Sequence, residues 1–381
     1  MTGPLEGLLV ADFSRVLAGP YCTMLLADLG ATVVKVEGPD GDETRRWMPP
    51  SAGDDATYFL SVNRGKRGIV LDLADPADAE VARALAARAD VVVQNFLPGT
   101  AAKWDLDYDS VRTSNPGAVY ASISGFGADS PQPGYDVLAQ ALSGFMSVTG
   151  EPGGPPTKAG VAIVDVVTGL HAAVGILAAL HHRDRTGEGQ HVEVNLLSSA
   201  LSALANQTGA WAFAGVVPQR LGNEHPSIFP YGPFPTADGD LVIAIGNDRQ
   251  FARLREGLGM PVDERFRAAA DRSLRRDELR PLLVAALASR SARAWHEVLS
   301  GSGVPCAPIL DIAEAFALAD RLGLAPLART ADGDVVGTRS PVQFSESPVE
   351  YRLTPPTPDR DRDWVEREVV ARDREGGRFG A

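Results

Sequence analysis

Residues 7–37, GLLVADFSRVLAGPYCTMLLADLGATVVKVE, carry the pattern that decides the fold. The apolar run at 7–13 predicts a buried strand, and a Gly-Pro break then opens a helical stretch that Gly30 ends. A second strand is expected over 32–37. The stretch therefore predicts a β-α-β unit.

The same alternation continues along the chain. Further strands are expected over 68–73, 90–96, 118–124 and 191–195, and further helices over 76–88, 136–146 and 165–182. Strands that alternate with helices predict a parallel sheet covered on both faces. The predicted fold class is therefore α/β, with a doubly wound parallel sheet.

The chain divides into segments of different character. We expect a large parallel-sheet domain over 1–215, a turn-rich linker over 216–224 and a smaller α+β domain over 225–320, with a hairpin at Asp238-Gly239. Residues 321–381 form a C-terminal segment. Its charge-dense run from Pro355 is typical of a solvated helix or a frayed end.

Composition argues against several classes of protein. With 381 residues and 44% hydrophobic content, the chain can bury a substantial core. A formal net charge of -13 disfavours nucleic-acid binding, which needs a basic surface. Two cysteines outside any ligand spacing argue against disulfides and a metal site. Because no apolar run reaches about 18 residues and no basic leader occurs, we expect no membrane span and a cytoplasmic location.

Asp165 is the only ionisable residue between Lys158 and His171, within an apolar stretch that predicts a helix. An aspartate just before such a helix is most often an N-cap. A carboxylate at a helix N-terminus, held ionised by the helix dipole, can also act as a nucleophile. Local sequence leaves both roles open.

Two loops are candidates for phosphate binding. The first β-α turn, residues 14–20, has one glycine and lacks the spacing that lets a backbone approach a pyrophosphate, which argues against a nicotinamide dehydrogenase. Residues 63–68 read NRGKRG, and their three cations could clamp phosphates, or the loop could simply be solvated. Neither a convincing histidine site nor the GxSxG elbow of serine hydrolases is recognisable.

Several motifs, taken together, resemble the class III CoA-transferase (CaiB/BaiF) family over nearly the whole chain. Besides the opening stretch and the Asp165 helix, they are NRGKRGIVLDL, QNFLPGTAAKWDLDY, SGFG, GYDVLAQALSGFMSVTG, TGEGQHVEVNLLSSAL and SGVPCAPI. Each piece is weak, but their order and spacing are specific. The stretches around 195–211 and 222–251 are most similar to succinyl-CoA:dicarboxylate CoA-transferases.

The resemblance implies an interlocked homodimer. Each subunit would have a Rossmann-like large domain, a smaller α+β domain and a C-terminal segment that returns to the large domain. Coenzyme A is the implied cosubstrate, an acyl-CoA and a carboxylic acid are the substrates, and no permanently bound cofactor is expected. Asp165 matches the covalent nucleophile of the family. The residues expected to bind CoA are Val16, Ala18, Leu71, Leu73, Asn95, Phe96, Lys103, Tyr135 and Gln140.

Two departures from the family pattern narrow the expected activity. Leu17 stands where formyl-CoA transferase has a glutamine, so formyl or oxalyl transfer is not expected. Tyr135 stands where the related racemases have a histidine, and a phenol is a poor base for an α-proton. Transfer to a dicarboxylate is therefore favoured over an acyl-CoA racemase, an acyl-CoA hydrolase or a non-catalytic CoA-binding protein. Arg15, Arg46 and Arg220 are the candidates to bind the second carboxylate.

Overall fold

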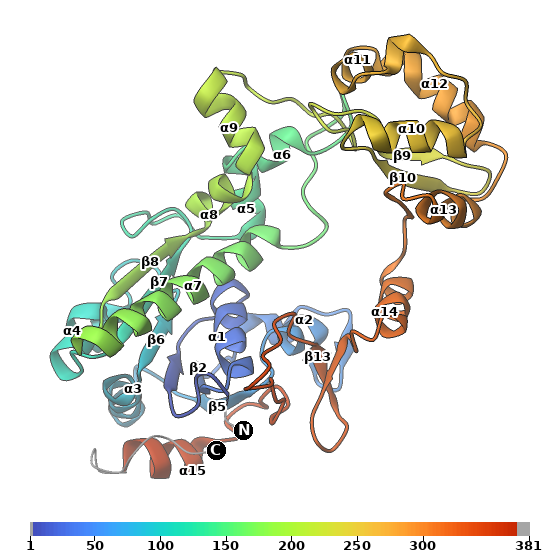
Figure 1. Cartoon of the computed structure of the whole chain (residues 1–381). Coiled ribbons are helices and arrows are strands. Elements are labelled where there is room, and N and C mark those ends of the chain that lie inside the picture. Colours follow the sequence, from blue (N-terminus) through green and yellow to red (C-terminus); the bar gives the residue numbers. More distant parts are fainter. Residues whose placement is uncertain (1–2, 372–381) are drawn as a thin grey trace. The chain divides into compact units, whose positions relative to one another are not determined.

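The computed structural model describes residues 3–371 (Figure 1). Within this range the chain forms two compact units. The first comprises residues 3–145, 159–216 and 325–371, and the second comprises residues 146–158 and 217–324.

A six-stranded sheet forms the centre of the first unit (Figure 1). Its strand order is β5-β2-β1-β6-β7-β8, and every neighbouring pair runs parallel. The strands are β1 (Leu9–Asp12), β2 (Thr32–Glu37), β5 (Lys66–Val70), β6 (Val91–Gln94), β7 (Val119–Ser124) and β8 (His191–Asn195). The α/β class and the parallel sheet expected from the sequence are confirmed.

The inner strands are buried on both faces. In β1, Val10 packs into a core with α1 (Ala18–Asp28) and α7 (Ile163–Thr186), whereas Leu9 and Ala11 pack into a second core with α3 (Pro76–Arg88). Consecutive strand residues point to opposite faces, so a strand covered on both sides reads as a continuous apolar run. The shorter helices of the unit are α2 (Thr57–Ser61), α4 (Tyr108–Ser114), α5 (Asp136–Leu142), α8 (Leu196–Ala203) and α9 (Ala205–Ala214).

The strand order reverses between β1 and β6. The chain runs from β1 through β2 to β5 on one side and then returns to β6 on the other. Loops that follow two such strands form a ligand crevice at the carboxyl edge of an open parallel sheet. Here the two loops are joined, because the Arg15 N–H donates to Asn95 Oδ1 (3.0 Å) and Asn95 Nδ2 donates to the Arg15 carbonyl (2.8 Å).

The C-terminal segment lies along β5, a terminal strand of this sheet. It first forms a hairpin of β12 (Leu327–Arg329) and β13 (Val335–Thr338). The backbone N–H of Gly68 then donates to Asp361 and that of Val70 donates to Asp359, each at 2.9 Å. Carboxylates of the charge-dense run thus take the place of strand carbonyls along this edge.

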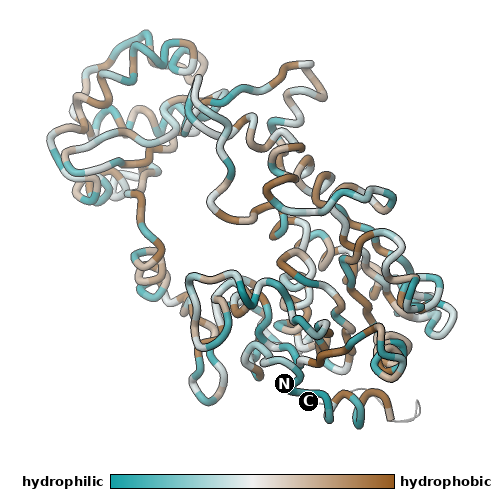
Figure 2. Tube along the Cα trace, turned by 180° about the vertical axis from the view of Figure 1, so that it is seen from behind, coloured by the Kyte–Doolittle hydropathy of each residue, from teal (hydrophilic) through white to brown (hydrophobic). Residues whose placement is uncertain are grey.

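The end of the described chain also enters the core. Val365 and Val369, in the π-helical turn η4 (Val365–Val370) after α15 (Arg362–Trp364), pack beside α3. Figure 2 shows hydrophilic and hydrophobic residues alternating along this last segment. The expectation of a solvated or frayed end is therefore wrong for residues 359–362, because their charged side chains bind backbone groups of β5, whereas Glu366 and Arg367 in the turn that follows are exposed. The rest of that run lies outside the described residues.

A three-stranded antiparallel sheet, ordered β11-β10-β9, forms the centre of the second unit. Its strands are β9 (Tyr231–Pro235), β10 (Asp240–Ala244) and β11 (Cys306–Pro308), and β9 and β10 form a hairpin around Asp238-Gly239. Its helices are α10 (Asp248–Gly257), α11 (Ala269–Leu274), α12 (Arg276–Leu287), α13 (Ala292–Gly301) and α14 (Ile312–Arg321).

Residues 146–158 belong to this second unit, although their sequence continues the expected large domain. Their loop is tied to the segment after residue 216, since the Gly222 N–H donates to the Gly150 carbonyl (3.0 Å) and Arg220 donates to the Ser147 carbonyl (3.3 Å). Hydrogen bonds across about 70 residues leave no trace in local periodicity. The short helix α6 (Phe145–Val148) opens this loop.

The long helix α7 is the one helix in the described part of the chain that is long and apolar enough to cross a membrane by composition. Half of its most apolar window is buried inside the protein. A buried core helix of a parallel-sheet unit has this composition because it packs on the sheet.

Candidate active site

A cavity of about 250 Å³ lies at the carboxyl ends of β1, β6 and β7, beside the point where the strand order reverses. The loops that follow these strands line it, together with Tyr135 and Asp165. Its charged lining residues are Arg15, Glu43 and Asp165. The cavity therefore brings together the proposed nucleophile and the first loop of the fold.

Asp165 lies in the first turn of α7 but does not cap it. The helix begins at Ile163, and Asp136 supplies the cap from the start of α5. Asp136 Oδ1 accepts from the backbone N–H of Val164 (2.8 Å) and of Asp165 (3.2 Å). The N-cap interpretation of Asp165 is therefore wrong, and its carboxylate is left without that structural role.

Gln140 fixes the capping carboxylate in turn. Its Nε2 donates to Asp136 Oδ2 (2.5 Å), and its Oε1 accepts from the Ala159 N–H (2.8 Å). Gln140 is fully buried. A chain of hydrogen bonds thus holds Asp136 against the N-terminus of α7.

The Asp165 carboxyl group is buried, with 6% exposure, and no cation pairs with it among residues 3–371. Burial, followed by the negative charge of Asp136, raises the pKa of Asp165 to about 7. Burial and Asp136 therefore oppose the helix dipole, which is expected from the sequence to keep this group ionised. A carboxyl group whose pKa lies near neutral pH is more typical of a catalytic residue than of a structural one.

The first loop, which lines the same cavity, has a strained backbone. Val16 has φ of 69°, in the left-handed region that a β-branched residue rarely adopts. Buried side chains hold the neighbouring backbone, because Lys35 Nζ donates to the Ser14 carbonyl (3.0 Å) and Lys66 Nζ donates to the Pro20 carbonyl (2.9 Å). Hydrogen bonds from these two buried lysines therefore hold the loop in its conformation.

A network of buried charges provides this support. Asp12 pairs with Lys66 (3.1 Å), and Lys35 pairs with Asp42 (2.9 Å). Asp12 also accepts from the Ser14 N–H (3.0 Å). Sequence reasoning missed this network, although charged residues inside the apolar strands β1 and β2 were a visible signal.

The basic cluster at residues 63–68 is part of this structural system. Arg64 is buried and forms a two-pronged pair with Asp28, and Arg67 pairs with Asp361. With Lys66 also buried, the cluster neither clamps phosphates nor lies in solvent. Both interpretations drawn from the sequence are wrong, because each cation has an internal carboxylate partner.

A second cavity of about 420 Å³ adjoins the first, and Arg15 and Phe96 line both. The expected CoA-binding residues divide between the two cavities. Those lining the Asp165 cavity are Val16, Ala18, Asn95, Phe96 and Tyr135, and those lining the second cavity are Leu71, Leu73 and Phe96.

Two expected CoA-binding residues line neither cavity. Lys103 lies on the surface in the turn η2 (Ala101–Trp104). Gln140 is buried behind Asp136, where the hydrogen bonds described above occupy its amide. The structure therefore gives Gln140 a supporting position at the site.

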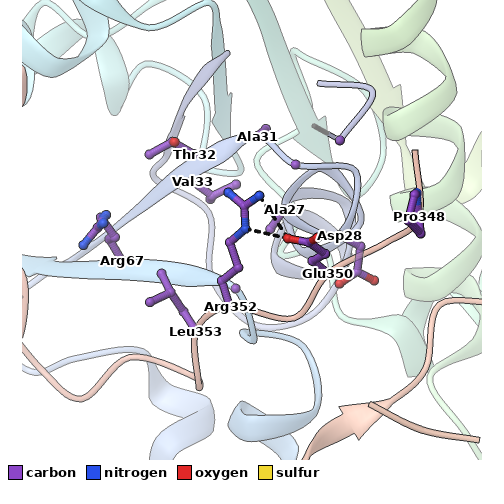
Figure 3. Close-up of a pocket in the computed structure, with 13 residues that line it drawn as sticks. Ala27, Asp28, Ala31, Thr32, Val33, Arg67, Pro348, Glu350, Arg352 and Leu353 are labelled. Atoms are coloured by element: carbon purple, nitrogen blue, oxygen red, sulfur yellow. Dashed lines mark hydrogen bonds and ion pairs between the residues drawn. The ribbon is translucent and has the colours of Figure 1, made fainter. Parts of the chain in front are cut away.

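A further cavity of about 260 Å³ lies between the end of α1 and residues 348–353 (Figure 3). None of the expected site residues lines it. Its charged groups are already paired, since Asp28 binds Arg64, Arg67 binds Asp361, and Glu350 binds Arg352. This cavity is therefore a structural feature apart from the site.

The doubly wound sheet and a carboxyl group that has no cation partner among residues 3–371, placed at its switch point, indicate an α/β enzyme that acts on a ligand bound at the carboxyl edge. Residues 5–362 match the model of CoA-transferase family III, and the chain belongs to this family. It is a CoA-transferase, and coenzyme A is its cosubstrate.

Named relatives are similar over most of their length. The succinate–glutarate CoA-transferase of Agrobacterium fabrum is 43% identical over 93% of this chain and 92% of its own. The succinyl-CoA:mesaconate CoA-transferase of Haloarcula hispanica is 42% identical with the same coverage. Among solved structures, a CaiB/BaiF family protein from Brucella suis superposes with a TM-score of 0.88 at 38% identity, covering 97% of this chain and all of that one.

Proposed function

We propose that this CoA-transferase moves CoA from succinyl-CoA to a short dicarboxylate, through a covalent thioester on Asp165. The substrates are suggested by the relatives, whose names specify succinyl-CoA with glutarate or with mesaconate. The observation that carries the mechanism is the Asp165 carboxyl group itself: buried, free of any cation among the described residues, and placed in the cavity at the switch point.

The first half of the reaction places CoA on the enzyme. The Asp165 carboxylate attacks the thioester carbon of succinyl-CoA, and CoA leaves as the thiolate, which gives a mixed anhydride. The thiolate then attacks the carbonyl carbon of Asp165. Succinate leaves with the bridging oxygen, and aspartyl-CoA remains.

The second half reverses these steps with the acceptor. Its carboxylate attacks aspartyl-CoA and releases the thiolate, which gives a second anhydride. The thiolate attacks the acceptor's acyl carbon, and Asp165 leaves as a carboxylate that carries the bridging oxygen. No net redox change occurs, and both thiolate and carboxylate are regenerated.

The raised pKa of Asp165 suits this cycle. An aspartate of ordinary pKa is a weak base and a weak nucleophile, whereas a carboxylate with a pKa of about 7 binds a carbon or a proton more strongly. The absence of a paired cation in the described chain leaves its oxygens free to attack. Burial also excludes water, which would otherwise hydrolyse the anhydride.

Each step develops negative charge on a carbonyl oxygen, and the first turn of α1 offers donors for it. Leu17 and Ala18 line the Asp165 cavity at the N-terminus of this helix. The first N–H groups of a helix have no acceptor within the helix. We assign these groups to the oxyanion.

The two adjoining cavities suggest how CoA lies. Val16, Ala18 and Asn95 would contact the thioester end beside Asp165, and Leu71 and Leu73 would contact the nucleotide end in the second cavity. Phe96 lines both and would contact the middle of the molecule.

The surface of the first unit supports a homodimer. Helix α9 has no buried residue, and its Trp211 and Phe213 are 64% and 94% exposed. Val174 of α7 is 65% exposed as well. Large exposed apolar groups mark protein interfaces. A second copy of this chain is the proposed partner, in the interlocked form of the family, and a monomeric mass by light scattering would contradict it.

Oxygen exchange tests the mechanism directly. The enzyme is incubated with unlabelled succinyl-CoA and with glutarate whose carboxylates carry heavy oxygen. The mass of the peptide that contains Asp165 is then measured by mass spectrometry. Each turnover through Asp165 moves one heavy oxygen from glutarate into this peptide. Turnover that leaves the peptide unlabelled would sink the covalent mechanism. Labelling from heavy water with loss of CoA, in the absence of acceptor, would indicate a hydrolase.

A further inference from the structure

We infer that Arg15 is the residue that selects dicarboxylates, by binding the distal carboxylate of the succinyl group and of the acceptor. This inference rests on the proposed function, because it assumes that the reacting carbonyl lies at Asp165. It adds a specificity-determining residue on the first loop of the fold.

The charges that line the Asp165 cavity lead to this assignment. Once the thioester carbon is at Asp165, the rest of a short acyl chain must lie in the same cavity of about 250 Å³. Glu43 and Asp165 are acidic, and Arg15 is the one cation among the described lining residues. A second carboxylate taken from water needs a cation or several donors. Arg15 is the partner that this cavity offers.

Arg15 is also available to bind an anion. Its backbone N–H and carbonyl are both hydrogen-bonded by the Asn95 side chain, which fixes the start of the side chain at the cavity. Within residues 3–371, its guanidinium has no carboxylate or carbonyl partner. A substrate carboxylate would therefore displace no internal ion pair, and the guanidinium fork can bind both of its oxygens.

The other two arginines considered from the sequence are placed differently. Arg46 donates to the Asp40 carbonyl and lines neither of the two adjoining cavities. Arg220 belongs to the second unit, where it donates to the Ser147 carbonyl. The structure therefore separates three candidates that the sequence could not rank.

Arg15 also lines the second cavity, which we assign to the nucleotide end of CoA. A guanidinium there could bind a CoA phosphate, and the experiment must separate the two anions. The kinetics allow it, because kcat/KM for the donor and for the acceptor are independent in a ping-pong reaction. Succinyl-CoA and butyryl-CoA share every phosphate and differ in the distal carboxylate. Glutarate and pentanoate differ in the same way and contain no phosphate.

The test measures kcat/KM for these four substrates with wild type, Arg15→Met and the control Arg46→Met, together with the Kd of free CoA. For Arg15→Met, values for succinyl-CoA and glutarate should fall about 10- to 100-fold, the range for a lost hydrogen bond to a charged group. Values for butyryl-CoA and pentanoate, and the Kd of CoA, should change less than about threefold. Arg46→Met should leave all of them unchanged.

Several results would overturn the assignment. Equal losses with both CoA thioesters, weaker binding of free CoA and an unchanged glutarate value would mean that Arg15 binds phosphate. Equal losses with all four substrates, or no loss with any, would also exclude a role in selecting dicarboxylates. If Arg15→Met does not fold, Arg15→Gln is measured in the same way. Failure of the proposed function shows separately, as wild type that prefers pentanoate or takes no heavy oxygen into Asp165.

Discussion

Asp12 and Asp165 are both buried carboxyl groups in the first unit, but their surroundings are opposite. Asp12 accepts hydrogen bonds from Thr23 Oγ1 (2.6 Å) and from Lys66 Nζ (3.1 Å), as well as from the Ser14 backbone and hydroxyl. Asp165 has no such donors to its carboxyl group in the described structure, and its charged neighbour is another carboxylate, Asp136.

The pKa values follow from these surroundings. Burial by itself would raise the pKa of Asp12, but the charges of Lys66 and Lys35 and the two hydroxyls more than offset it, so the pKa stays below its ordinary value. Burial and Asp136 together raise the pKa of Asp165 to about 7. Partners, rather than burial, therefore decide whether a buried aspartate stabilises the fold or remains reactive.

The largest expected effect is the loss of turnover in Asp165→Asn. Removing a covalent nucleophile should lower kcat by about 10⁴-fold or more, because the anhydride is proposed to form on Asp165 and an asparagine amide cannot replace its carboxylate. Steady-state transfer from succinyl-CoA to glutarate measures it, with CoA binding by calorimetry as the control. Turnover within tenfold of wild type would move the nucleophile elsewhere.

The same variant should be more stable than wild type above neutral pH. Since the folded pKa of Asp165 lies above the ordinary value of 3.8, its contribution to stability is fully present below that value and is lost as pH rises through about 7. A neutral asparagine avoids this loss, so Asp165→Asn should gain up to about 4 kcal/mol at pH 8 and little at pH 4. Urea unfolding at the two pH values measures the difference.

Asp12→Asn should show the reverse pattern, with a large loss of stability. Removing one partner of a buried pair leaves Lys66 as an uncompensated cation, at a cost of about 3–5 kcal/mol. Burial already lowers the pKa of Lys66 to about 8, so part of the cost appears as its deprotonation near neutral pH. Urea unfolding measures the loss, with the exposed Asp54→Asn as a control that should be unchanged. Wild-type stability in Asp12→Asn would show that the network contributes nothing to folding.

The sequence predicts the sheet well for a physical reason. Strands buried on both faces have few positions where a polar residue is tolerated, so β1, β2 and β6 are apolar runs between turn signals. The buried charged exceptions are Asp12, Lys35 and Glu37, and each belongs to a buried ion pair. Their partners could not be named, because Lys66 is 54 residues from Asp12 and only the folded chain brings them together.

Local sequence led to wrong predictions for charged residues whose hydrogen-bond partners are backbone groups or lie far away in the sequence. A dense run of charge predicts solvent, yet Asp359 and Asp361 accept from N–H groups of β5, which every second residue of an edge strand offers without a sequence signal. Asp165 precedes an apolar stretch and so resembles an N-cap, while the true cap, Asp136, lies 29 residues before it. The family resemblance identified Asp165, but only the structure shows that its carboxyl group does not cap α7, because Asp136 accepts those hydrogen bonds instead.

The smallest expected effect tests how much the negative charge of Asp136 contributes to the raised pKa of Asp165. Asp136→Asn removes the negative charge beside Asp165 and leaves its burial unchanged, so the pKa of Asp165 should fall from about 7 by part of the shift. The acid limb of kcat/KM reports this pKa in the free enzyme and should move down by up to about one pH unit. At pH 6, where a group of pKa about 7 is about one-tenth ionised, kcat/KM should rise up to about fivefold relative to its own plateau.

Asp136→Asn keeps the cap of α7 but disturbs the contact with Gln140. The effect of the lost charge and the effect of the disturbed contact can be separated by their dependence on pH. Asparagine Oδ1 can still accept from the N–H groups of Val164 and Asp165, but its amide would face the Nε2 donor of Gln140. That clash lowers stability and the plateau of kcat/KM equally at all pH values, because neither amide titrates. A change in the titration midpoint therefore reports charge alone. A profile that only drops in height would mean that Asp136 positions α7 without tuning Asp165, and that burial by itself distinguishes Asp165 from Asp12.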